Sequence, residues 1–313
     1  MDKQKERITW IDSARGITII LVVLGHCIGY VDDPLNKWIL SFHMPTFFFL
    51  SGMCLNIKRP AKEYIYKKFK RMFPWQIFLA IICITYDWIA NGSVNFVQNV
   101  FIWFLPVLFY SEVVFWALNK MFTNYIYVYI ICITSIFLVQ CLNIRTVLHF
   151  ECVPMALLFV TIGYCMKKYL LEYRKIHYAK LKIFCLLLIT ILIARKNSSV
   201  LMYNNDYGNL AFFMITAICG TLIICAEGKK WQNNTILQAF GKNSVLVYVL
   251  HFRLTNLLHF LLNKGLKIKL DLYKFPRYWV IFLLEMLFMY MSIVIFVKIK
   301  KIIVNKKIQE RVY

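Results

Sequence analysis

The feature that most constrains this chain is a series of apolar runs, most of them long enough to cross a lipid bilayer. A membrane-spanning helix needs about 20 mostly apolar residues, and 60% of the 313 residues are hydrophobic. Lipid offers no partners for bare backbone N–H and C=O groups, so each run must be helical, or buried in protein where it is not. Hydropathy indicates about ten runs, at residues 16–31, 36–57, 74–91, 99–118, 125–142, 147–166, 181–195, 208–227, 236–262 and 278–299.

The expected fold class is therefore an all-α integral membrane protein, with about ten transmembrane helices in a single bundle. No fixed-period repeat and no Pro- or Gly-rich linker divides the chain, so we expect one membrane domain over residues 1–313, with a short cytoplasmic tail from about residue 300. Two runs should be irregular. Pro45 should loosen the helix of run 36–57 one turn away, and run 236–262 is so long that it should bend or begin with an interfacial piece.

The net charge of +22 comes largely from basic residues that lie between the apolar runs. In these positions Lys and Arg act as topology signals and contacts for anionic lipid, so we expect the bilayer, and not nucleic acid, as the partner. With the N-terminus inside, roughly three times as many Lys and Arg fall in cytoplasmic as in outer segments, so both termini should be cytoplasmic. The outer segment 263–277 is itself basic and would suit an anionic substrate or a lipid head group.

The ten cysteines form no C-x-x-C pair, and nearly all of them lie inside apolar runs. We interpret them as small apolar space-fillers and expect neither a disulfide framework nor a metal site. His149 and Glu151 should lie near the outer surface, where they could touch an acceptor substrate.

Ionisable side chains inside apolar runs are expensive, so each one is a functional candidate. Arg15 and His26 are eleven residues apart, so both should point the same way, separated by roughly 16 Å along the helix. Arg15 at the cytoplasmic mouth and His26 deeper inside suit a long donor with an anionic head whose reactive end reaches inward. The alternative is that Arg15 only anchors the helix and His26 only bonds a neighbouring helix. Asp12 and Ser13 can cap the start of this helix.

Two further histidines lie inside apolar runs. The second run should return from outside, which places His43 at a depth near that of His26, so the two imidazoles can share one cavity. His251 lies in run 236–262, where a satisfied structural role and a substrate contact are equally plausible. We take His26 and His43 as candidate catalytic residues, and His251 and Ser51 as candidates for substrate binding.

Basic residues gather where the chain re-enters the membrane before Pro74, in the segment Lys67-Lys-Phe-Lys-Arg71. Arg binds phosphate in a bidentate fashion, so Lys70 and Arg71 could join Arg15 in holding the phosphates of a nucleotide-type donor. The simpler interpretation is a topology signal with lipid contacts, which explains at least some of these charges.

At these residues the sequence resembles the acyltransferase family 3 proteins, integral membrane O-acetylases of surface polysaccharides, and in particular their fucose 4-O-acetylase branch. Three stretches carry the resemblance: Trp10 to His26 with its Arg-x10-His spacing, Phe42 to Gly52, and Lys70-Arg71-x-x-Pro74. Weaker matches are Trp103 to Pro106 and Gly241 to His251.

The resemblance implies a multi-pass protein of the bacterial plasma (inner) membrane, with acetyl-CoA as the acyl donor bound from the cytoplasm. It places Arg15, Lys70 and Arg71 at the donor and makes His26 essential. The expected acceptor is a glycan or an undecaprenyl-linked sugar. On this basis His26 would accept the proton of the sugar hydroxyl, and His43 would position the acceptor or steady the oxyanion. A transient acetyl-imidazole on His26 is the alternative.

Other membrane functions would also suit a basic, histidine-bearing bundle. A transporter or flippase of lipid-linked sugars would not require acetyl-CoA and would often show internal duplication, which this sequence lacks. A polysaccharide polymerase or ligase should have a long extracytoplasmic loop, and the hydropathy pattern leaves no room for one. Acyl transfer is therefore the favoured hypothesis.

Overall fold

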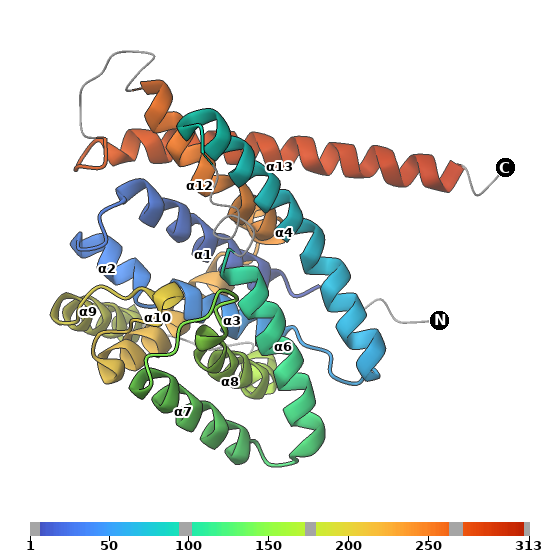
Figure 1. The fold of residues 1–313 in the computed structure, drawn as a ribbon, viewed down its shortest axis with the longest axis vertical. Helices are drawn as coiled ribbons and strands as arrows, with labels where there is room; N and C mark the ends of the chain where they lie inside the picture. The colour runs from blue at the N-terminus through green and yellow to red at the C-terminus, as the bar shows by residue number, and fades with distance from the viewer. Residues whose placement is uncertain (1–6, 94–101, 173–179, 263–271, 310–313) are drawn as a thin grey trace.

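The computed structural model describes residues 7–93, 102–172, 180–262 and 272–309, and within these ranges it is a helical bundle (Figure 1). An isolated bridge between Leu201 and Asp206 is the one strand-like pairing in the described residues. The helices are α1 Thr9–Ile28, α2 Pro34–Leu40, α3 His43–Met53, α4 Ala61–Asn91, α6 Phe104–Met121, α7 Tyr125–Cys141, η1 Phe150–Cys152, α8 Val153–Glu172, α9 Lys180–Lys196, η2 Met202–Asn204, α10 Leu210–Lys230, α11 Thr235–Lys242, α12 Ser244–Phe260 and α13 Tyr278–Gln309.

The structure confirms the expected all-α membrane class. Five of the described helical segments are long and apolar enough to cross a membrane, judged by length and composition. They are Thr9–Ile28, Ala61–Ile89, Phe150–Leu171, Leu210–Lys230 and Tyr278–Ile303. Each of the remaining expected runs also contains at least one described helix, and residues 99–101 lie outside the described residues. That the chain crosses the membrane ten times stays a prediction.

Both expected irregularities are present. α2 ends at Leu40 and α3 begins at His43. A proline inside a helix clashes with the carbonyl group four residues earlier, which for Pro45 is that of Ser41, so the break falls where the proline requires it. The long run 236–262 is divided at Asn243, where α11 ends and α12 begins.

α4 differs from the sequence-based expectation at its start. The apolar run begins near residue 74, but the helix begins at Ala61 and continues through Pro74. The basic segment before Pro74 is thus helical, and its side chains have a fixed angular order around α4. This order decides which of the cations can reach the interior.

Pairs of glycines let four helices approach closely. A Cβ on Gly163 of α8 would lie 2.0 Å from the carbonyl oxygen of Phe49 in α3, and one on Gly52 of α3 would lie 2.1 Å from that of Val160. A Cβ on Gly241 of α11 would lie 1.7 Å from the carbonyl oxygen of Asp12 in α1. Small residues at such crossings are how helices pack in membranes, where backbone contact replaces the hydrophobic drive.

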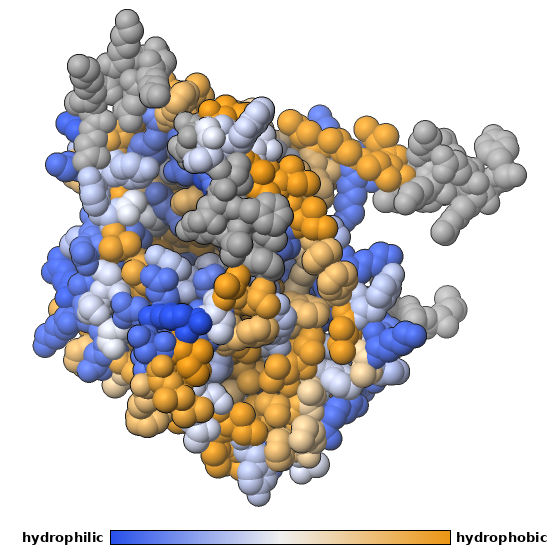
Figure 2. All heavy atoms as spheres, in the orientation of Figure 1, coloured by the Kyte–Doolittle hydropathy of each residue, from blue (hydrophilic) through white to orange (hydrophobic). Residues whose placement is uncertain are grey.

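The surface is consistent with a lipid environment. Large apolar side chains remain exposed on α7, α9 and α13, among them Phe137, Phe184 and Leu283. Figure 2 shows apolar surface across the middle of the molecule, with hydrophilic surface toward its left and right edges. Contiguous exposed apolar surface on this scale indicates contact with a membrane or a partner.

α1 begins, and α13 ends, on the same side of the bundle (Figure 1). The structure contains no membrane, so the assignment of this side to the cytoplasm stays a prediction. Most of the basic outer segment 263–277 lies outside the described residues, as do residues 1–6 and 310–313.

The glycine contact between α3 and α8 can be tested by Gly163→Val. The added side chain meets the backbone of Phe49, which cannot move aside without separating the helices. We expect a loss of about 3 kcal/mol or more of stability, as for overpacking at a site that cannot relax, seen as a lower midpoint of thermal unfolding in detergent. Ala211→Val, at an exposed position of α10, should leave the midpoint unchanged.

Candidate functional site

A cavity of about 100 Å³ lies between α1, α3, α4, α6 and α12. One water molecule needs about 10–15 Å³ of such space, so the cavity is large enough for several water molecules or part of an extended chain. Its lining residues are Arg15, Ile19, Val22, Met44, Phe47, Ser51, Arg71, Met72, Trp75, Phe104, Leu105, Leu108, Glu112, Ser244, Val245 and Tyr248.

The cavity is polar at one end and apolar at the other, because its helices change character in the same direction. Along α1 the lining changes from Arg15 to Val22, and along α12 it changes from Ser244 to Tyr248. The lining side chains of α6 also change from polar, at Glu112, to apolar, at the start of the helix. Those of α3 and α4 change from polar to apolar in the same direction. An anionic group is therefore favoured at one end and a hydrocarbon chain at the other.

A buried ion pair closes the wall of the polar end. Glu112 of α6 is 1% exposed. Its carboxylate lies 2.6 Å from the ammonium group of Lys68 in α4 and accepts a 2.5 Å hydrogen bond from the hydroxyl group of Ser51 in α3. Tyr64 donates to the backbone carbonyl of Glu112 at 3.2 Å. The sequence alone could mark Glu112 as an intramembrane carboxylate, but it could not identify these partners.

The cations expected at the donor separate into two groups. Arg15 and Arg71 line the cavity, and Arg15 also donates to the carbonyl oxygen of Leu50 at 3.3 Å. Lys70 is exposed and its ammonium group lies over the ring of Tyr66, 5.8 Å from the centroid. Residues two apart on a helix point about 200° apart, so Lys70 cannot share the inward face of Lys68.

Three histidines lie one helical turn beyond the apolar end of the cavity. His26 follows Val22 on α1, His251 follows Tyr248 on α12, and His43 comes one turn before Phe47 on α3. The ring centroids of His26 and His251 are 4.7 Å apart. His43 and His251 also lie within electrostatic range of His26 and of each other. The structure therefore brings the three candidate imidazoles together.

The three imidazoles differ in their surroundings. The Nδ1 atom of His43 lies 2.8 Å from the carbonyl oxygen of Ile39, and that of His251 lies 2.7 Å from the carbonyl oxygen of Tyr248. Both rings are buried, whereas His26 is exposed. His26 is therefore the imidazole that a substrate can reach, and its two neighbours are held by backbone carbonyl groups.

A buried carboxylate supports the same region from α13. Glu285 is fully buried and accepts hydrogen bonds from Cys27 at 3.3 Å and from Thr255 at 2.7 Å. Thr255 also donates to the carbonyl oxygen of His251 at 3.0 Å. These contacts tie α13 to α1 and α12 beside the histidines. The sequence alone could not identify Cys27 and Thr255 as the partners of Glu285.

The expected cap of α1 is wrong. The N-cap position is Ile8, and no side chain caps the helix. Asp12 lies one turn into the helix, where it accepts two hydrogen bonds from Arg7, and Ser13 donates to the carbonyl oxygen of Trp231 at 3.1 Å. Because the helix begins at Thr9, both side chains lie past the position from which they could cap it.

Comparison with known proteins gives a single finding. The sequence model of acyltransferase family 3, described as an acyltransferase domain, matches residues 8–298. Neither the curated proteins nor the solved structures give a match.

The buried pair at the polar end can be tested through its two partners. Glu112→Leu leaves the Lys68 ammonium group without its carboxylate, and we expect a loss of about 3 kcal/mol, measured as a lower midpoint of thermal unfolding in detergent. The double variant Lys68→Met/Glu112→Leu removes both charges and should recover most of that loss. A double variant as unstable as Glu112→Leu would contradict the pairing.

Proposed function

Because this chain belongs to acyltransferase family 3, we propose that this multi-pass membrane protein transfers an acetyl group from cytoplasmic acetyl-CoA to a sugar hydroxyl. The acceptor would belong to a surface polysaccharide or to its undecaprenyl-linked precursor, and the site would be the bacterial inner membrane. The observation that carries the proposal is the cavity, which has two arginines at one end and points toward three clustered histidines one helical turn beyond the other end.

The shape and charge of the cavity suit the donor. Arg15 and Arg71 would bind its phosphates at the polar end, where arginine can make charge-assisted, bidentate contacts. The nucleotide would stay at the mouth, beside the two arginines, and the extended pantetheine arm would enter the cavity. Three helical turns separate Arg15 from His26, which lets the arm carry the thioester to the imidazole.

His26 would act as the general base. An imidazole near neutral pH can accept the proton of the attacking hydroxyl group. The oxygen of the sugar then forms a bond to the thioester carbonyl carbon, the carbon–sulfur bond breaks, and the CoA thiolate takes the proton back from the imidazolium. His43 would steady the oxyanion or position the acceptor, and His251 would hold the ring of His26 in place.

The transporter hypothesis gains no support from the family match, which describes an acyltransferase domain. The polar end of the cavity also argues against it. Two arginines at the polar end of a space whose other end is apolar suit an anion that binds and leaves on the same side.

The role of His26 is tested by mass spectrometry of the cell-surface glycan. His26→Ala, at wild-type level in the membrane, should reduce acetylation at least ~100-fold, the usual contribution of a general base. His259→Ala is the matched control, because this buried histidine stacks on Tyr273 beyond the cluster. A gene deletion that leaves acetylation intact but shortens the glycan would instead support the transporter.

The donor site is tested by two adjacent cations of α4, of which Arg71 lines the cavity and Lys70 does not. Arg71→Ala removes a cavity-lining charge and should raise the KM for acetyl-CoA by about 10-fold or more, as expected for a lost charged hydrogen bond. Lys70→Ala removes an equal charge that does not line the cavity and should leave the KM within about 2-fold of wild type. Equal effects of the two variants would show that the donor does not bind in this cavity.

A further inference from the structure

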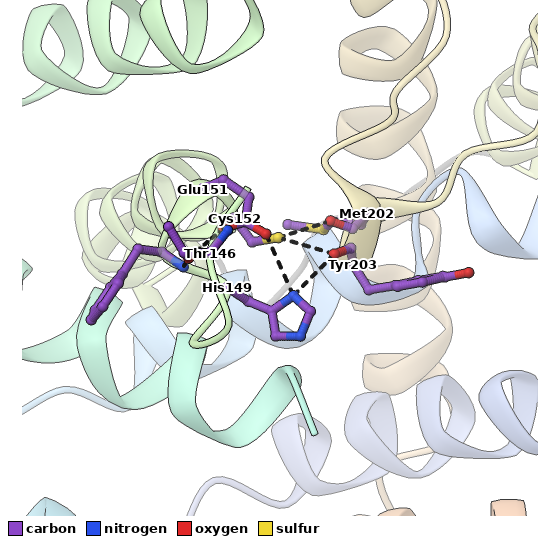
Figure 3. Close-up of polar contacts among 7 residues, drawn as sticks. Thr146, His149, Glu151, Cys152, Met202 and Tyr203 are labelled. Carbon is purple, nitrogen blue, oxygen red and sulfur yellow. Dashed lines mark hydrogen bonds and ion pairs between the residues drawn. The ribbon is translucent and has the colours of Figure 1, made fainter. Parts of the chain in front are cut away.

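We propose that a Zn²⁺ ion binds among His149, Glu151 and Cys152, where it joins the start of α8 to the loop before α10. These three residues offer one imidazole nitrogen, one carboxylate oxygen and one sulfur atom, all within 4.8 Å of one another. Figure 3 shows them turned toward the backbone of Met202 and Tyr203. The spacing of the cysteines predicts no metal site, but here the ligands are of three kinds and only one of them is a cysteine.

Three of the contact distances are close to the edge lengths of a zinc coordination tetrahedron. Zinc bonds of about 2.0–2.3 Å place tetrahedral ligand atoms roughly 3.3–3.8 Å apart. The Nδ1 atom of His149 lies 3.5 Å from Oε1 of Glu151 and 3.2 Å from the carbonyl oxygen of Tyr203. That same carbonyl oxygen lies 3.6 Å from Sγ of Cys152. The carbonyl oxygen of Tyr203 can therefore serve as the fourth ligand.

The cluster holds more lone pairs than hydrogens. The Nδ1 atom of His149 carries at most one hydrogen, but it faces two oxygen atoms. The thiol of Cys152 carries one hydrogen and faces the carbonyl oxygens of Met202, at 3.1 Å, and Tyr203. A cation that replaces these hydrogens would bind His149, Cys152 and the carbonyl oxygen of Tyr203 together, while the carbonyl oxygen of Met202 keeps its hydrogen bond from the backbone N–H of Asn205. Zinc accepts nitrogen, oxygen and thiolate ligands together.

The carboxylate is already oriented for this task. Oε2 of Glu151 accepts hydrogen bonds from the backbone N–H and the hydroxyl group of Thr146, at 3.1 and 2.6 Å. Oε1 is the atom that faces His149. An outer partner that occupies one oxygen and directs the other is typical of metal-binding carboxylates.

A second, independent observation points to a ligand. The hydroxyl group of Tyr207 is buried, the residue is 2% exposed, and this oxygen has no hydrogen-bond partner in the described structure. It lies within electrostatic range of Glu151 and Cys152. A buried hydroxyl group without a partner is costly, and a thiolate or carboxylate bound to zinc would give it an acceptor.

The surroundings suit a structural ion. Gln140 of α7 donates to the carbonyl oxygen of Asn205 at 2.7 Å, and Ser199 donates to the carbonyl oxygen of Val31, just beyond α1, at 2.9 Å. The loop between α9 and α10 is thus already held against α7 and the end of α1. Zinc would add a link to α8, at the end of the bundle that carries His26. His149, which is partly exposed, gives the ion a route of entry.

The test is metal analysis of the full chain, purified in detergent with a tag that contains no histidine and loaded with ZnCl2. Wild type should retain about one zinc per chain after gel filtration, and Cys152→Ala and His149→Ala should retain almost none. Cys141→Ser, which alters an exposed cysteine at the end of α7, should bind zinc like wild type. Loaded with Co²⁺ instead, wild type should show a thiolate-to-metal absorption band that Cys152→Ala lacks.

Chelation covers the case of a variant that folds poorly. A chelator should lower the midpoint of thermal unfolding of wild type and of Cys141→Ser, and should leave that of Cys152→Ala unchanged. Wild type that retains no zinc, or variants that retain as much as wild type, would overturn the proposal. Neither result would bear on acyl transfer, because this cluster is separate from the cavity.

Discussion

A bilayer offers a polar side chain no water to bond, and this constraint divides the charges of the bundle into two groups. Some are paired within the protein. Glu112 joins α6 to α4 through Lys68, and Asp87 joins α4 to α12 through Arg253, at 3.0 Å. These pairs hold the helices around the cavity in register. Arg15 instead lines the cavity itself, where a positive charge can recruit an anion.

The direction of Arg15 depends on the residue next to it. A Cβ on Gly16 would lie 2.1 Å from the carbonyl oxygen of Leu237, and Gly241 makes the reciprocal contact with the backbone of Asp12. Backbone contacts this close prevent α1 from rotating against α11. Adjacent helical residues point about 100° apart, so a fixed Gly16 also fixes Arg15, and through three regular turns it fixes His26. The glycines thus orient a functional face to which they do not belong.

Much of this arrangement could be predicted from the sequence, because helical periodicity and depth follow from residue spacing. The common depth of His26 and His43 and the break before His43 are of this kind. The choice between Lys70 and Arg71 could not be predicted, since the segment is basic on every side and the helix was expected to begin only after it. The pairing of Glu112 with Lys68 depends on the distance between two helices, and the spacing of residues along one helix gives no information on that distance.

The cluster at His149 shows a different limit. Its side-chain ligands come from a short segment before α8. The carbonyl groups that these side chains face come from a loop some fifty residues later, and sequence patterns do not span such a separation. The same loop contacts the chain just beyond α1, so the rim of the bundle near His26 is built from segments with little helical support. Under the proposed function the acceptor approaches from this rim, while the donor arm comes from the opposite end. A metal ion at this rim would tie the loop before α10 to the start of α8 and so supply a link that helix packing does not, while the acyl-transfer site itself depends on the helices around the cavity.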